Sequence, residues 1–397
     1  MERCYPHKKT YLFLVILTST FVFFAFTALD YTDHNKTSNS IEISDSVGEM
    51  NSVVPQSPLS GKELYMQACA NCHGVDGKGG SVKQLGLQTP PPDFTDCDFA
   101  SREPDGDWVA VAHQGGPTRG FSTEMPAFGE ALTVEQLQKI MNHVRTFCRN
   151  DNWPRGELNL PRALVTEKAY PEDEAVISSF IDVENEGALT NEIVYEQRFG
   201  ARNQIEIVLP FGYSQMPGGS WSGGHLGDMA IGVKRVFYHN YNSGTIFSLT
   251  GEVILPTGDS ATGFGKGTSV LEPFASFGQL LPAGSFLHVQ SGLEYPVLQD
   301  KAENEAFWRA ALGKSINPNP WGRTWSPMVE VLGSKALESG TEVHWDLVPQ
   351  MQITLNKRQH VMLNIGYRIP VDDTSRDSQV MVYILWDWFD GGFFEGW

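Results

Sequence analysis

An alternation of apolar and polar residues, running from Asn191 almost to the last residue, constrains the fold of this chain more than any other feature. The segment IFSLTGEVIL has two faces of opposite character: Phe247, Leu249, Val253 and Leu255 against Ser248, Thr250 and Glu252. A period of two is that of a β-strand, whose successive side chains point to opposite sides. Comparable segments are NQIEIVLPF, SFLHVQSGLEY, HWDLVPQMQITL, HVMLNIGYRI and VMVYILWDW. With weaker segments they predict an all-β antiparallel barrel of about 10–12 strands, each of about ten residues, over residues 191–397.

The alternation leaves open which face meets water. A soluble barrel or sandwich turns its apolar face inward, whereas an outer-membrane barrel turns that face to lipid. The long strands, the scarcity of lysine and the ending FFEGW favour the membrane barrel. Aromatic residues also gather near strand ends: Trp321, Trp325, Trp386 and Trp388. In a membrane barrel the polar mid-strand residues line the interior: Glu206, Glu252, His288, Glu294, His344 and Arg368.

The segments FGARNQIEIVLPFGY and VILPTGD resemble parts of the bacterial outer-membrane β-barrel group that includes proteins attached to aromatic-degradation operons. This resemblance covers residues 191–397 and implies no particular substrate.

The motif CANCHG, residues 69–74, carries the clearest chemistry of the chain. In C-x-x-C-H motifs two thiols add to the vinyl groups of a haem, and the adjacent histidine coordinates its iron. Cys69 and Cys72 lie on one side of a helix and so reach the same porphyrin edge, while His73 is presented to the metal. A zinc site would need a second ligand pair and a thioredoxin-like site would lack the histidine, so haem is favoured. Ser60 and Glu63 predict a capping box at the start of this helix.

The second axial ligand of the iron must come from further along the chain. Met66 is too close to the attachment site, and Met141 belongs to the apolar stripe of a helix within TVEQLQKIMNHVRTFC. Met125, in the loop GFSTEMPAFGE with a proline directly after it, is the preferred ligand. His113 and His143 are the alternatives, and would give a bis-histidine site.

Residues 60–148 resemble a class I c-type cytochrome, with the motif helix, the M-P-x-F-G loop and a closing helix in family order. The resemblance implies a small all-α domain around one covalently bound haem c, held by Cys69 and Cys72, with His73 and Met125 as axial ligands. It implies one-electron transfer, so that the chain is an electron carrier and not an enzyme, whether alone or within a larger oxidoreductase system. The family also has a proline-bearing segment that orients the histidine, and PPPDFTD, residues 90–96, is the segment to consider.

Four cysteines remain once Cys4, in the N-terminal segment, is set aside. Because Cys69 and Cys72 belong to the haem motif, Cys97 and Cys148 are the candidates for a disulfide in an oxidising compartment. Two separate buried thiols are the alternative.

The chain is predicted to be multidomain. Its expected parts are a signal peptide or membrane anchor at 1–30, a flexible linker at 31–59, the cytochrome domain at 60–148, a connector at 149–190 and the barrel at 191–397. Basic residues followed by the apolar run YLFLVILTSTFVFFAFTAL indicate export, and we favour cleavage of this signal. In the connector, Arg155 and Arg162 either contact the haem propionates or are solvated charges.

The formal net charge of -18 excludes a nucleic-acid partner, because phosphate binding needs clustered Lys and Arg. The expected partners are redox proteins of the bacterial cell envelope and a membrane, the outer membrane being favoured, with the cytochrome domain facing the periplasm. The leading function is electron transfer by a cytochrome that the barrel anchors. The alternatives are an outer-membrane channel or transporter with an accessory haem domain, and a cytochrome-porin fusion that accepts extracellular electrons. A single haem does not bridge a hydrocarbon core of about 30 Å, which weighs against the last.

Overall fold

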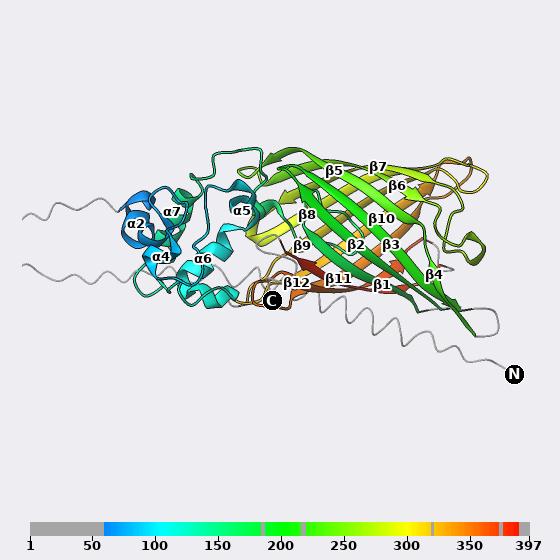
Figure 1. Ribbon diagram of the computed structural model, residues 1–397. Coiled ribbons are helices and arrows are strands. Elements are labelled where there is room, and N and C mark those ends of the chain that lie inside the picture. The colour runs from blue at the N-terminus through cyan, green and yellow to red at the C-terminus, as the bar shows by residue number, and fades with distance from the viewer. Residues whose placement is uncertain (1–58, 184–186, 216–219, 319–320, 373–375, 389–397) are drawn as a thin grey trace, which may run out of the picture. The chain divides into compact units, whose positions relative to one another are not determined.

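The computed structural model describes residues 59–183, 187–215, 220–318, 321–372 and 376–388, which form a helical domain followed by a β-barrel (Figure 1). The expected signal at 1–30, all but Leu59 of the expected linker at 31–59, and the ending FFEGW lie outside the described residues. In the described part of the chain, no helix is both long and apolar enough to cross a membrane.

The helical domain begins at a capped helix. Its elements are α2 Gly61–Ala68, α3 Ala70–His73, α4 Val82–Leu85, α5 Cys97–Arg102, α6 Asp105–Gln114, the 3-10 turn η1 Gly116–Arg119 and α7 Val134–Val144. Ser60 and Glu63 form the predicted capping box, in which the Ser60 side chain accepts from the Glu63 N–H and the Glu63 carboxylate accepts from the Ser60 N–H. A second capping box joins Thr133 and Gln136 at the start of α7. These side chains satisfy backbone donors that have no partner within the helix.

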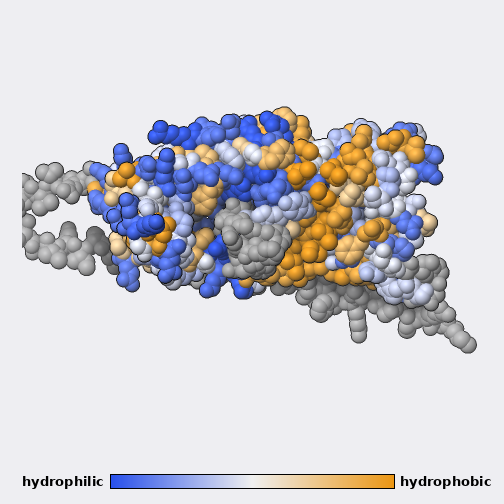
Figure 2. All heavy atoms as spheres, in the orientation of Figure 1, coloured by the Kyte–Doolittle hydropathy of each residue, from blue (hydrophilic) through white to orange (hydrophobic). Residues whose placement is uncertain are grey.

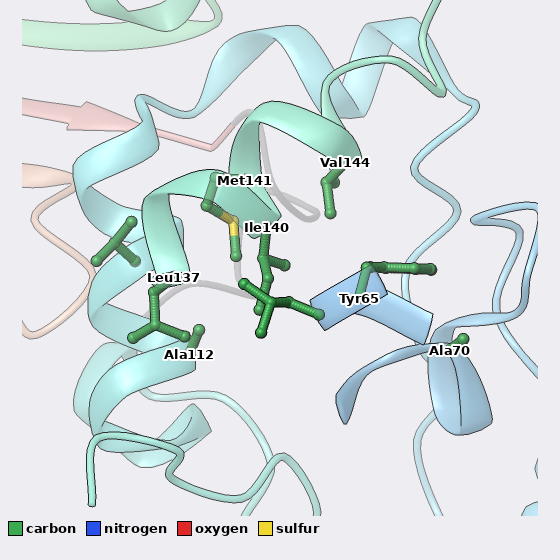
Figure 3. Packing of buried hydrophobic residues seen from close by; sticks show 9 residues of the cluster. Tyr65, Ala70, Ala112, Leu137, Ile140, Met141 and Val144 are labelled. Atoms are coloured by element: carbon green, nitrogen blue, oxygen red, sulfur yellow. The ribbon is translucent and has the colours of Figure 1, made fainter. Parts of the chain in front are cut away.

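The core of this domain lies between α7 and α2. Leu137, Ile140 and Val144 of α7 are buried at helical spacing and belong to one apolar cluster with Tyr65 of α2 (Figure 3). Met141 is in the same cluster and is 7% exposed, which agrees with its assignment to the core.

Cys97 and Cys148 form a disulfide bond, with their Cα atoms 5.1 Å apart. The bond ties the start of α5 to the chain just after α7. The domain is therefore cross-linked near its end, whereas Cys69 and Cys72 are unpaired.

Thirteen strands occur in the described residues, all paired antiparallel in one sheet. They are β1 Glu174–Asp182, β2 Ala188–Phe199, β3 Asn203–Gln215, β4 Trp221–Leu226, β5 Met229–Asn240, β6 Thr245–Leu255, β7 Val270–Leu280, β8 Ser285–Pro296, β9 Glu305–Lys314, β10 Trp325–Ala336, β11 His344–Thr354, β12 Val361–Pro370 and β13 Gln379–Asp387. β1 pairs with both β2 and β13, and β2 pairs with β3, so the sheet closes into a 12-stranded barrel to which β4 is added beside β3. The predicted antiparallel barrel is thus confirmed.

The barrel is polar inside and apolar outside. On β6, Ser248 and Thr250 are 0% and 4% exposed, whereas Leu249 between them is 43% exposed. Figure 2 shows apolar residues gathered over the strands on the face in view. Outward apolar side chains recur around the barrel: Ile177, Ile193, Ile205, Ile231, Leu271, Val289, Leu312, Val329, Ile365 and Ile384. This is the surface of a barrel that faces lipid, and it rules out the soluble alternative, which would bury these residues.

Glu206 and His288 are buried on the inner side, as predicted. Glu252 lies on the same face of the sheet. Glu206 of β3 is opposite Gly232 of β5, and Gly232 is in turn opposite Glu252 of β6. His344 differs from the prediction, because it lies at the first position of β11, is exposed, and is hydrogen-bonded at 3.0 Å to Asp372 in the loop after β12. It belongs to the rim of the barrel because β11 starts there.

Residues 158–173 enter the barrel and fill part of its interior; we call them the plug. Leu158, with Ala169 and Tyr170, packs on inward side chains of β5 and β6, and Leu164 packs on those of β1, β2, β10, β11 and β13. Polar side chains of the wall bind the plug backbone as well. Gln352, Asn364 and Tyr383 donate hydrogen bonds to the carbonyl oxygen of Arg162.

The barrel therefore starts earlier than the sequence indicated, within the segment 149–190 that was assigned to a connector. The last residue of the plug, Asp173, directly precedes β1. Arg162 is 8% exposed and forms ion pairs inside the barrel, so it is neither a solvated charge nor a ligand of haem propionates, and both expectations for it are wrong. Arg155 forms ion pairs with Asp105 and Glu157 at 3.1 and 2.5 Å.

The two ends of the barrel have different connections. The three shortest turns, 200–202, 241–244 and 281–284, lie at the end where β1 starts and the plug enters. The longest excursions, 216–228 with β4 and 256–269, lie at the opposite end.

Candidate haem site

The C-x-x-C-H motif lies on two short helices that meet at Cys69. This residue ends α2 with φ -117° and ψ -34°, and α3 continues from Ala70 to His73. Gly74 then ends the helix with φ +79°, a conformation in which an L side chain is strained. The Tyr65 hydroxyl donates to the Gly74 carbonyl oxygen at 2.7 Å and fixes this end. Gly74 and Tyr65 thus set the direction in which the chain leaves the helix after the motif.

The two motif cysteines are not part of a disulfide bond. Cys69 and Cys72 are both partly buried. Burial, with Cys72 close by, raises the pKa of Cys69 to about 11. Neither sulfur is bonded to another cysteine, so both are free to form thioether bonds.

His73 presents a neutral imidazole. Burial lowers its pKa, and neutral imidazole is the form that binds a metal. Its Nδ1 atom is buried and makes no hydrogen bond to the described residues. The ring of Phe94 stacks on it with centroids 5.0 Å apart and an angle of 21°. The segment 90–96 thus reaches the histidine through Phe94, whose N–H donates to the carbonyl oxygen of Gly77 at 2.7 Å.

Met125 is held by the end of α6. Its carbonyl oxygen accepts from the Gly116 N–H at 3.0 Å, and its own N–H donates to Ser122 at 3.3 Å. A Cβ atom on Gly115, where φ is +84°, would come within 3.1 Å of the same carbonyl oxygen, so the close approach requires glycine. The Met125 side chain is partly buried against the same apolar cluster that Cys69 contacts.

The other candidate axial ligands differ from Met125 in their surroundings. The side chain of Met66 is 44% exposed, and Met141 is in the core. The ring of His113 stacks on Trp321 with centroids 4.7 Å apart, and its Nδ1 lies 2.6 Å from the Gln114 amide. His143 packs edge-on against Tyr65 at 5.3 Å. Met125 remains the preferred second ligand, and this assignment stays a prediction.

These donors fit a haem. Two unpaired thiols three positions apart, a buried imidazole with a free nitrogen, and a thioether beside the same apolar cluster make up the set that c-type haem uses. Sequence reasoning did not identify Phe94 and Tyr65 as supports of the site. The aromatic within PPPDFTD was the available signal for Phe94, whereas Tyr65 resembles any core residue of an amphipathic helix.

Comparisons with known proteins give separate matches for the two parts of the chain. Residues 56–144 match the family model described as Cytochrome C oxidase, cbb3-type, subunit III. A cytochrome c domain implies haem c as the cofactor. No curated protein matches the chain.

Solved barrels are similar to the second part of the chain at low identity. The "KdgM porin" is 8% identical with a TM-score of 0.37, covering 54% of this chain and 99% of its own. The "NanC porin" is 8% identical with a TM-score of 0.39, covering 54% and 98%. The "Translocator domain of autotransporter NalP from Neisseria meningitidis" is 10% identical with a TM-score of 0.30, covering 54% and 86%. The strand order and the apolar outer surface of this chain themselves identify its barrel as one that faces lipid.

Proposed function

We propose that this chain is a monohaem c-type cytochrome that transfers single electrons at the periplasmic face of the outer membrane, where its barrel anchors it. The observation that carries the proposal is the convergence of the motif helices and the Met125 loop on one apolar cluster. C-x-x-C-H occurs once in the sequence, which supports a single haem. The acidic net charge of -18 favours basic redox partners of the cell envelope.

Each site residue has a role in this proposal. Cys69 and Cys72 hold the haem through thioether bonds, His73 is the proximal ligand and Met125 the distal one. Bound haem supplies a one-electron iron couple, whose potential a Met/His ligand pair raises. Phe94 keeps the imidazole plane fixed by stacking on it. Two protein ligands leave no coordination position for a substrate, which supports a carrier rather than an enzyme.

The lengths of the barrel connections support the periplasmic orientation. Outer-membrane barrels have short periplasmic turns and longer extracellular loops. The three shortest turns lie at the end where the plug enters, and the chain reaches the plug from the helical domain. These connections support a periplasmic position for that end of the barrel and for the cytochrome domain.

The plug weighs against the two alternative functions. A channel needs an open interior, but residues 158–173 pack on inward side chains from most of the strands. A route for extracellular electrons needs redox centres inside the barrel, and the plug that occupies the interior carries none. The anchor function requires neither.

Three measurements test the proposal, two on purified protein and one on intact cells. The full chain is produced in a bacterium with cytochrome maturation and extracted from outer membranes with detergent. We expect haem that stays on the polypeptide after denaturation, a redox titration that fits one electron, and protection of the helical domain from protease in intact cells. A colourless protein refutes the cytochrome assignment, and cleavage of the helical domain in intact cells refutes the orientation.

A further inference from the structure

Trp321 is a residue of the barrel that contacts the helical domain. It lies in the connection between β9 and β10, at the end of the barrel where the plug enters. Its side chain is partly buried and packs against the same apolar cluster as Cys69 and Met125. An aromatic residue near a strand end of a membrane barrel commonly meets the lipid headgroups. The contact of Trp321 is instead with the core of the helical domain.

The indole ring of Trp321 supports the end of the Met125 loop through His113. The two rings stack with centroids 4.7 Å apart and an angle of 25°. The His113 ring also lies directly against Gly129, where a Cβ atom would come within 2.5 Å of His113 Cε1. The backbone joins the same two residues, because the Gly129 N–H donates to the His113 carbonyl oxygen at 3.0 Å. Trp321 therefore holds the end of the M-P-A-F-G sequence through one intervening ring.

The backbone of Trp321 supports the chain before Met125 through Arg119. Arg119 of η1 donates from Nη1 to the Trp321 carbonyl oxygen at 2.8 Å. Its side chain is buried, and its Nε donates to Asp107 at 2.8 Å, so the guanidinium has a fixed position. The same turn begins at Gly116, whose N–H donates to the Met125 carbonyl oxygen at 3.0 Å. Trp321 thus contacts supports of Met125 on both sides of that residue in the sequence.

Neighbouring residues of the barrel fix the connection that carries Trp321. The Thr324 N–H donates to Thr354 Oγ1 at 3.0 Å, and the Thr324 hydroxyl donates to Gln359 Oε1 at 2.7 Å. Gln359 has φ +64°, a conformation that is uncommon for a residue other than glycine. Its side-chain amide donates at 3.4 Å to Asp107, the carboxylate that binds Arg119. A connected set of contacts therefore runs from the barrel strands to the Met125 loop.

A metal ligand depends on the residues that hold it. Residues that orient a ligand affect both the strength of its bond to the metal and the reduction potential. Apolar residues packed around a haem site also exclude water and lower the local dielectric constant, which favours the less charged ferrous state. A tryptophan that holds the Met125 loop and covers the adjoining apolar cluster acts in both ways.

We propose that Trp321 is a positioning residue of the haem site, through which the barrel fixes the Met125 loop and keeps water from the apolar cluster beside it. The inference rests on the proposed function, because it requires haem ligated by Met125. It also extends that function. The barrel then completes the redox site in addition to anchoring it.

The test compares Trp321→Ala with Trp325→Ala in the detergent-solubilised, haem-loaded full chain. Trp325 is the matched control, because it starts β10 close by in the sequence and is 41% exposed. In Trp321→Ala we expect a weaker absorption band from the bond between methionine sulfur and iron, and a lower midpoint potential. Cyanide, which displaces methionine from ferric haem, should bind about ten-fold faster. Trp325→Ala should match the wild type in all three measurements.

Two further variants separate positioning from folding. Trp321→Phe keeps a ring that can stack on His113 and should restore most of the band and of the potential. Trp321→Leu stays apolar but cannot stack, so it should shift in the same direction as Trp321→Ala, and it decides the question if Trp321→Ala takes up no haem. Hydrogen exchange of a peptide that contains Gly129 should be faster in Trp321→Leu than in the wild type, because the support of the loop is lost.

Wild-type values of the absorption band, the potential and the cyanide rate in Trp321→Leu overturn the proposal. Equal shifts in Trp321→Leu and Trp325→Ala also overturn it, because the effect is then a general one of disturbing this connection. A wild-type chain without covalent haem refutes the cytochrome assignment instead. The two proposals therefore fail in distinguishable ways.

Discussion

Thr166 of the plug and Glu330 of β10 are joined by two hydrogen bonds to one carboxylate oxygen, from the Thr166 amide at 2.8 Å and from its hydroxyl at 2.7 Å. The other oxygen of Glu330 accepts from the amides of Leu164 and Val165 at 2.8 and 3.1 Å. One side chain of the wall thus satisfies three successive backbone donors of the plug. Buried N–H groups need such partners, and each one left without a partner costs about 1–3 kcal/mol.

Glu330→Ala should therefore loosen the plug. The wild-type barrel is expected to conduct almost no ions in planar bilayers, whereas the variant should show frequent openings, because the amides of Val165 and Thr166 lose their acceptor and that of Leu164 keeps only Gln350. Glu342→Ala, at an exposed position beside the start of β11, is the control and should behave as the wild type. Equal conductance of Glu330→Ala and the wild type would show that this carboxylate does not hold the plug.

Met125→Ala should abolish the absorption band that arises from the bond between methionine sulfur and iron, and lower the midpoint potential. Spectroscopy of the oxidised protein and a redox titration measure the two effects. Met66→Ala is the matched control, because Met66 lies on the motif helix but is 44% exposed. A variant lacking Met125 that retains the band would point to His113 or His143 as the ligand.

Loss of the disulfide should destabilise the helical domain. The bond between Cys97 and Cys148 closes a loop with a sequence separation of 51. A loop of that length corresponds to about 4 kcal/mol in the chain-entropy model. The double variant Cys97→Ser/Cys148→Ser should lower the midpoint of thermal unfolding. This midpoint is measured from the loss of haem absorbance on heating. Each single variant also lacks the bond but leaves one free thiol, so comparison with the double variant separates loss of the bond from oxidation of that thiol. An unchanged midpoint in the double variant and both single variants would contradict the prediction.

The stability of the helical domain should fall in acid because of Asp105. Burial favours the protonated form of this carboxyl, but Arg145 at 2.8 Å and Arg155 at 3.1 Å outweigh burial and lower its pKa below the ordinary 3.8. The contribution of a group with a lowered pKa is complete above the unfolded value and is lost as the pH falls through the folded one.

Chemical unfolding between about pH 5 and pH 2 measures this effect as a slope of free energy against pH. Asp105→Asn should flatten the slope and cost about 3 kcal/mol at neutral pH, since buried Arg145 loses its carboxylate partner and keeps only the carbonyl oxygens of Ala100 and Glu103. Arg145→Gln removes the same pair from the other side and should flatten the slope to a similar degree. If Asp105→Asn keeps the wild-type slope of unfolding free energy against pH, the acid sensitivity arises from other carboxyl groups.

Local sequence determined most of the helical domain. The capping boxes at Ser60 and Thr133 act over three residues, and the apolar stripe of α7 lies within one helix, so both could be predicted directly. The strands were predictable for the same reason, because alternation is a property of consecutive residues. Both faces of β6 appear in the order that the sequence indicated, and the exposure of Leu249 decides between lipid and core.

The plug could not be predicted in this way, because its partners are distant in sequence. Leu164 meets Glu330 across 166 positions, and no period in residues 158–173 indicates a regular element. The available signal was chemical. A barrel with polar residues inside needs partners for them, and the charges from Arg162 to Glu174 supply these partners next to the first strand.

The burial of Leu158 inside the barrel also limits how far the helical domain can move from the barrel. Cys148 is fixed by its disulfide, Leu158 is 1% exposed inside the barrel, and only residues 149–157 join them. Fully extended, this segment spans about 35 Å, at about 3.5 Å per residue. In the proposed function, a donor or acceptor must therefore come close to the barrel to exchange an electron, because the helical domain cannot move far from it.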